Sequence, residues 1–113
     1  MLCDTVTNIE KKTVDAEGAY DVGIQWLIGP DSQAPHFYMR LFEVAPGGHT
    51  PFHSHQMEHE IYVIDGRGKI NHETGFIHIG PGSFALVQPN EKHQFENCGD
   101  QPLHFLCIIP KGY

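Results

Sequence analysis

Short apolar segments separated by turn residues make up most of this chain. Twelve glycines and eight prolines occur among its 113 residues, between segments rich in Val, Ile, Phe and Tyr. Apolar residues show no helical period over three turns, and the spacing is typical of short strands joined by tight turns. Strands of this kind protect their edges by closing into a barrel or sandwich, so we predict an all-β jelly roll. The expected strands are 22–28, 36–45, 59–65, 68–73, 75–79, 83–88, 93–97 and 103–109.

The length and charge of the chain limit its function. A chain of 113 residues is long enough for one hydrophobic core, so we expect a single domain over 1–113 with its core at about 22–110. Seven basic and fourteen acidic residues give a formal net charge of -7, which argues against a nucleic-acid partner or an anionic membrane surface. We find no membrane-length apolar stretch, signal peptide or paired cysteines, and therefore expect a cytoplasmic protein.

Three histidines share one parity ahead of an apolar strand: His53, His55 and His59. Because strand side chains alternate between two faces, the three rings would line one wall, provided that residues 56–58 form no bulge. Imidazoles inside a barrel need partners for their ring nitrogens, and a divalent metal supplies one partner for several rings at once. The spacing therefore indicates a metal site, and the alternative is three solvated histidines on a loop.

Two segments resemble the paired signature motifs of the cupin superfamily: GGHTPFHSHQMEHEIYVIDG (47–66) and GPGSFALVQPNEKHQFEN (80–97). The matching residues are Gly47, His53, His55 and Gly66 in the first motif, and Gly82, His93 and Asn97 in the second. The similarity extends from residue 34 onward, through APHFYMRLFEVAPGG and FLCIIPK. It implies a cupin-type double-stranded β-helix, a jelly-roll barrel. Asn90 replaces the usual glycine of the second motif, and Asn also tolerates a left-handed turn.

The chain departs from most cupins at one ligand position. Most cupins supply a glutamate six residues before the last glycine of the first motif, where this chain has His59. It is therefore similar to the small single-domain manganese cupins with four histidines, which implies a metal held by His53, His55, His59 and His93. With the longer spacing of the motif, Glu60 would bind instead, but strand alternation turns it to the opposite side. Manganese is the expected ion, with iron, nickel, copper and zinc as alternatives.

Three further residues are candidates for the wall of a substrate pocket. Phe95 shares the parity of His93, and Phe105 shares that of Cys107, so the two rings would form an apolar surface beside the metal. Ordinary core packing is an equally simple explanation for both rings. Cys107 also matches a residue that borders the pocket in the manganese cupins, and its alternative role is a buried, inert thiol.

Charged residues near the motifs have less defined roles. Matched to the manganese cupins, Arg40 would sit near the pocket mouth, where it could steer an anionic substrate. A salt bridge to Glu43 is the alternative. Glu58 and Glu60 have the parity opposite to that of the histidines, so we assign no catalytic acid or base.

Four neutral imidazoles would leave the full charge on a divalent ion, and an octahedral ion would keep two open positions. We therefore expect a metal-dependent small-molecule enzyme of oxygenase type, acting on an anionic or chelating substrate and dioxygen. The alternatives are a non-catalytic module that binds a small anion or sugar, and a non-redox isomerase or decarboxylase. We also expect a homodimer that covers exposed sheet edges, with the N-terminal segment as a candidate contact.

Overall fold

The computed structural model describes residues 1–112, and within them the chain is almost entirely β. The strands are β1 (Lys12–Thr13), β2 (Tyr20–Ile28), β3 (Phe37–His49), β4 (His59–Asp65), β5 (Gly68–His72), β6 (Gly75–Ile79), β7 (Phe84–Val87), β8 (Gln94–Asn97) and β9 (Leu103–Pro110). Two helical turns, η1 (Val6–Asn8) and η2 (Pro30–Ser32), complete the elements. The all-β prediction is confirmed: every expected strand is present, β4 and β6 with the expected bounds and the others with shifted ends. The short β1 was missed.

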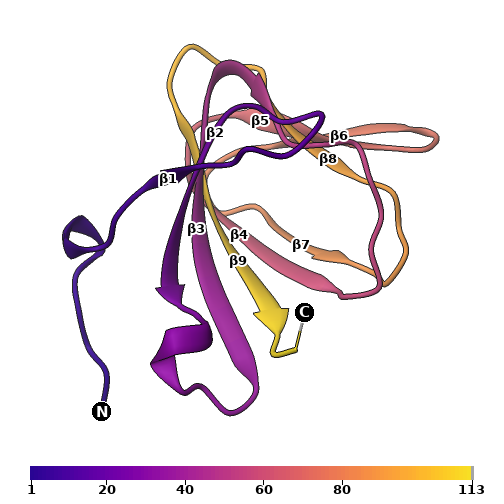
Figure 1. The fold of residues 1–113 in the computed structure, drawn as a ribbon. Coiled ribbons are helices and arrows are strands. Elements are labelled where there is room, and N and C mark those ends of the chain that lie inside the picture. Colours follow the sequence, from indigo (N-terminus) through magenta and orange to yellow (C-terminus); the bar gives the residue numbers. More distant parts are fainter. Residues whose placement is uncertain (113) are drawn as a thin grey trace.

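The strands form one antiparallel sheet that curls into a barrel (Figure 1). The order is β6-β5-β8-β3-β9-β4-β7, and β1 extends it through β2, which also pairs with β3. Strand β3 pairs with β2 and with β9 over most of its length and contacts β8 at its end. This long central strand therefore joins the two halves of the barrel, as expected for a jelly roll.

Alternating burial places the core inside the curl. Along β9, Leu103, Phe105, Cys107 and Ile109 are buried, while the residues between them are partly exposed. Strand β4 follows the same period and begins with a buried residue, His59. The period of two that builds the core therefore also directs a polar ring into it.

Two turns beside the barrel depend on left-handed backbone. Gly66, between β4 and β5, has a φ of 85°, and a side chain there would collide with the backbone of Pro102 and Leu103. Asn90 has a φ of 66°, so the expected left-handed turn is present. The Asn90 N–H donates to the carbonyl of His55 (2.7 Å), which ties this turn to the histidine segment.

The N-terminal segment lies against the outer edge of β2. The side-chain amide of Gln25 donates to the carbonyls of Val6 (3.0 Å) and Ile9 (2.9 Å), and the Val14 N–H donates to the Val22 carbonyl (2.8 Å). These bonds hold residues 6–14 on their own chain. Among residues 1–112, neither helical turn has the length or the apolar character needed to cross a membrane.

Candidate metal centre

The four motif histidines reach the barrel interior from three segments. His59 begins β4, whereas His53 and His55 lie in the irregular segment 50–58, which bends at Gln56 and Met57. The condition attached to their shared parity, that residues 56–58 form no bulge, is therefore not met, because the chain bends there. A single bridge instead fixes His53 beside His93: the His53 N–H donates to the His93 carbonyl (3.1 Å), and the His93 N–H donates to that of His53 (2.9 Å).

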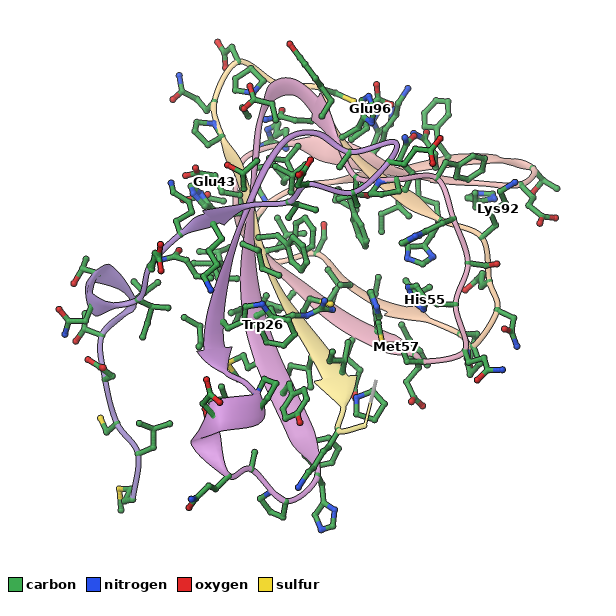
Figure 2. All side chains as sticks on the ribbon, viewed as in Figure 1. Trp26, Glu43, His55, Met57, Lys92 and Glu96 are labelled. Carbon is green, nitrogen blue, oxygen red and sulfur yellow. The ribbon has the colours of Figure 1, made fainter. Side chains whose placement is uncertain are left out.

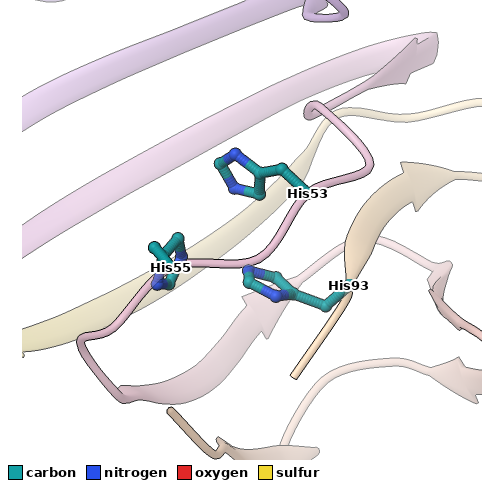
Figure 3. Close-up of side chains that lie close together, drawn as sticks. All are labelled: His53, His55 and His93. Carbon is teal, nitrogen blue, oxygen red and sulfur yellow. The ribbon is translucent and has the colours of Figure 1, made fainter. Parts of the chain in front are cut away.

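Three of these rings, those of His53, His55 and His93, gather in one small volume (Figure 3). The ligand atoms of His53, His55 and His93 lie within 4.8 Å of one another. The ring of His59 stacks on that of His55, with centroids 4.4 Å apart, and its centroid lies 5.4 Å from that of His93. His59 is buried and Glu60 is exposed. The interior side chain at the start of β4 is therefore the histidine.

Hydrogen bonds orient two of the rings. Nδ1 of His55 donates to the carbonyl of Met57 (2.9 Å), and Nδ1 of His93 donates to the carbonyl of Glu91 (2.8 Å). Each bond leaves Nε2 as the free lone pair, which is the usual arrangement of a metal-binding histidine. Within the described residues, Nε2 of His55 and both ring nitrogens of His59 are buried without any hydrogen-bond partner. Buried polar atoms rarely lack partners, so this cluster fits a bound ion.

Burial favours the neutral, metal-binding form of three of these rings, those of His53, His59 and His93. Burial lowers the pKa of His59 to about 2, and the positive charge of Arg40 adds to the effect. Burial also lowers the pKa of His53 and of His93 below the ordinary value. A proton therefore does not compete for these nitrogens near neutral pH.

Matching to known families decides what kind of protein carries this cluster. Residues 40–109 match the family model of the cupin domain. The chain belongs to the cupin family. The expected cupin barrel is confirmed, and the histidine cluster of this cupin lies where its two sequence motifs meet.

The curated relatives of this cupin have different functions. The 1-methylthio-D-xylulose 5-phosphate methylsulfurylase of Rhodospirillum rubrum is 32% identical over 71 residues, which are 63% of this chain and 46% of that enzyme. The oxalate-binding protein of Thermotoga maritima is 32% identical over 81 residues, 68% of this chain and 67% of that protein. The chain thus spans less than half of the methylsulfurylase. One fold hosts many functions, so family membership leaves the reaction open.

Among solved structures, this cupin is similar to the polyketide cyclase RemF from Streptomyces resistomycificus. The two superpose with a TM-score of 0.92 and 31% sequence identity, covering 97% of this chain and 79% of the cyclase. A cupin-2 domain from Rhodospirillum rubrum superposes with a TM-score of 0.84 at 24% identity, which shows the shared fold. Nearly the whole of this cupin therefore has a counterpart in RemF.

The histidines of this cupin open onto a cavity of about 190 Å³. Figure 2 shows His55 and Met57 on the inner side of the curled sheet. Phe105 stacks between Phe42 and Phe95, with ring centroids 5.2 Å and 4.5 Å away, and all three rings line the cavity. The lining also includes Val14 and Ala16 from the N-terminal segment, which sequence reasoning missed because no motif or period marks them.

The charged candidates Arg40 and Glu43 lie on opposite faces of β3. Arg40 is buried in the cavity wall and donates to the sulfur of Cys107 (2.9 Å). The alternative of an Arg40–Glu43 salt bridge is wrong, because Glu43 lies on the outer face and binds Lys11 and His104. Among the described residues, no Asp or Glu lines the cavity.

Proposed function

We propose that this cupin is a divalent-metal-dependent enzyme of oxygenase type that acts on a small, anionic, chelating substrate. The observation that carries the proposal is the set of four histidines on one apolar cavity, with buried nitrogens of His55 and His59 that find no partner in the protein. We assign the ion to His53, His55, His59 and His93, and expect manganese ahead of iron, nickel, copper or zinc.

The charge of the cavity favours an anionic substrate. Burial lowers the pKa of His53, His59 and His93 and so favours their neutral form, Arg40 is positive, and no carboxylate of residues 1–112 lines the wall. A bound divalent ion would supply Lewis-acid activation of an enolate, phenolate or carboxylate, and manganese or iron would add reaction with dioxygen. Among the described residues, no carboxylate lines the cavity to act as a general base, so we expect a substrate that is acidic enough to bind as its anion.

The apolar residues of the wall complete the site. The stacked rings of Phe42, Phe105 and Phe95 offer a flat surface for a planar substrate, and Met57 lines the same cavity. These side chains exclude water, which strengthens the electrostatic interactions inside the cavity. The carbonyls of Met57 and Glu91 keep two histidine rings in place through their Nδ1 hydrogen bonds.

A second candidate function is a non-redox conversion of the same substrate class, such as cyclisation or isomerisation of an enolisable carbonyl compound. Its support is the similarity to a polyketide cyclase across 97% of this chain at 31% identity. The cavity of about 190 Å³ holds one ring or a short dicarbonyl unit, so only part of a polyketide would enter it.

Metal exchange followed by a substrate screen tests both candidates. The metal-free protein is reloaded separately with Mn²⁺, Fe²⁺ and Zn²⁺, and incubated with β-dicarbonyl, phenolic, flavonoid and oxo-acid compounds, in air and without oxygen. Oxygen uptake coupled to substrate loss supports the oxygenase, and equal turnover without oxygen supports the second candidate. His93→Ala should abolish turnover, and His78→Ala, on the exposed face of β6, is the matched control.

Two outcomes of the same screen would contradict an enzymatic function. Substrate binding with no turnover for any metal would favour the metal-dependent binding module. Undiminished turnover by the metal-free protein would overturn the metal-dependent proposal.

We also propose that the protein forms a homodimer. Large apolar side chains are exposed on the outer faces of β4 and β7, among them Tyr62 (50% exposed), Phe84 (84%) and Leu86 (55%). An exposed apolar sheet face with an edge strand is a common site of self-association. Light scattering should give twice the 12.7 kDa chain mass, and Phe84→Glu should restore the monomer.

A further inference from the structure

Arg40 is a buried cation without a counter-ion. Its residue is only 8% exposed, and it lines the cavity that the four histidines share. Its guanidinium carbon lies 5.0 Å from the centroid of Phe42 and 5.5 Å from that of Trp26. Across residues 1–112, no carboxylate forms an ion pair with it, and its Nε is buried without a hydrogen-bond partner.

Among the described residues, the guanidinium of Arg40 has one hydrogen-bond acceptor, and that acceptor is weak. Its Nη2 donates to Sγ of Cys107 over 2.9 Å, and burial raises the pKa of that thiol, so the sulfur is uncharged. A thiol sulfur is a poor acceptor, whereas a guanidinium forms its strongest bonds with two oxygens of one anionic group. A buried charge whose partners among the described residues are one thiol and two aromatic rings, with no anion, is costly to the folded protein. The site therefore lacks an anionic oxygen ligand.

We infer that Arg40 binds an anionic oxygen of the substrate beyond those that chelate the metal, so that the substrate is a small chelating carboxylate such as an oxo-acid, hydroxy-acid or dicarboxylate. This inference rests on the proposed function, because it places the guanidinium and the ion on one ligand. Arg40 is thereby a specificity-determining residue: it selects substrates with a carboxylate over chelators of the same shape that lack one.

The size and the donors of the cavity favour a carboxylate over a phosphate. A volume of 190 Å³ corresponds to a sphere about 7 Å across, well below the usual range for ligand pockets. A phosphate group needs donors for three oxygens, but the polar side chains of the wall besides the histidines are Arg40, Thr50 and Cys107. The Thr50 hydroxyl accepts from the Phe95 N–H (2.8 Å) and has only one O–H to donate. One planar guanidinium satisfies a carboxylate.

Two probes of equal shape test the inference. Malonate and acetylacetone form the same six-membered chelate. At each end, malonate has a second carboxylate oxygen where acetylacetone has a methyl group. Co²⁺-loaded wild-type protein, Arg40→Met and Arg40→Lys are titrated with each probe, followed by the visible spectrum of the ion and by calorimetry. Arg67→Met, which removes an exposed arginine outside the cavity, is the matched control. Metal content is measured for every sample.

We expect Arg40→Met to lower the affinity for malonate at least tenfold and the affinity for acetylacetone less than threefold, with one ion per chain retained. Arg40→Lys should give an intermediate loss for malonate, and Arg67→Met should change neither probe. Metal-free Arg40→Met should unfold at a higher temperature than the wild type, because a buried unpaired charge is gone.

Several results would overturn the inference, and they separate it from the proposed function. If wild-type protein chelates both probes but Arg40→Met weakens them equally or not at all, Arg40 has no role in selection and the proposed metal site stands. A lower unfolding temperature of metal-free Arg40→Met would make Arg40 a structural residue. If wild-type protein binds the ion but neither probe, the chelating site fails together with the inference.

Discussion

His59 on β4 and His104 on β9 lie on opposite faces of the region formed by β3, β9 and β4. Their ring nitrogens differ in the partners that they find. On the inner face, His59 has two buried nitrogens without a partner in the described chain. On the outer face, both nitrogens of His104 are occupied: Nδ1 lies 2.5 Å from Asp65 and Nε2 lies 2.7 Å from Glu43. Lys11 then pairs with the other oxygen of Glu43 at 2.5 Å. Glu43 and His55 are well separated in Figure 2.

His104 finds its partners within the protein, whereas His59 does not. Burial alone would lower the pKa of His104, but its hydrogen bonds to Asp65 and Glu43 raise it. Through these bonds, the His104 ring links β9 to β3 and β4. Burial lowers the pKa of His59 instead, and its ring gains nothing from the surrounding protein. A ring that is kept in the interior without a partner is consistent with a ligand supplied from outside.

The largest effect expected from this comparison is on metal affinity. Loss of an outer partner of a ligating histidine typically costs 10- to 100-fold in affinity, so loss of the ring itself should cost more. We expect His59→Ala to weaken Mn²⁺ or Zn²⁺ binding by more than about 100-fold. His104→Ala removes a histidine ring from the outer face and should leave the metal affinity unchanged. Competition with a chelating dye measures both, and wild-type affinity in His59→Ala would contradict the four-histidine site.

Much of the fold could be predicted because the inner face is built by simple alternation. Residues 59–64 of β4 and all residues of β9 alternate between buried and less buried positions, so the strands and the inward turn of His59 follow from the pattern. The segment 50–58 was harder, since its bend at Gln56 has no turn signature. Strand β1 consists of Lys12 and Thr13, which is too short for any period to show.

The environment of the charged residues could not be predicted, because it depends on which strands pair. Arg40 and Glu43 are three residues apart on β3, so they face opposite sides and cannot meet. The partners of Glu43 come from β9 and from the N-terminal segment, at sequence separations of 61 and 32. Contacts at such distances come from the register of the sheet, and sequence spacing does not reveal them.

The pH dependence of the metal-free protein should show the next largest effect. A histidine whose pKa is lowered by folding stabilises the protein above its unfolded pKa of about 6.5, and this stability is lost as the pH falls. His59 alone should cost about 2 kcal/mol of unfolding free energy between pH 6.5 and pH 5. Urea unfolding at pH 7.5 and 5.0 measures the change. His59→Gln should flatten it, and a gain of stability on acidification would contradict the assignment.

Changing the ligand charge gives a smaller effect. His59→Glu should keep one ion per chain, because a carboxylate is also a good ligand, but it removes one unit of positive charge from the centre. Azide or acetate should then bind about tenfold more weakly, by roughly 1.4 kcal/mol. His59→Gln has nearly the shape of the Glu variant but no charge, so the difference in anion affinity between the two variants is the effect of charge. Equal anion affinity in the Glu variant and the wild type would mean that the fourth histidine has a role other than charge.

The smallest effect concerns the outer face. His104→Ala should cost about 1 kcal/mol or less, since solvent screens an exposed carboxylate such as Asp65. The sign of the pH dependence is opposite to that of the interior: a raised pKa gives stability below the unfolded pKa of about 6.5 that is lost as the pH rises through the folded pKa. Above that pH, the neutral ring has one N–H left and can donate to only one of its two carboxylates. The variant should therefore be weaker than wild type at pH 6 and similar to it at pH 9, as measured by urea unfolding. A deficit that grows with pH would show that His104 acts by packing and not as a cation between Asp65 and Glu43.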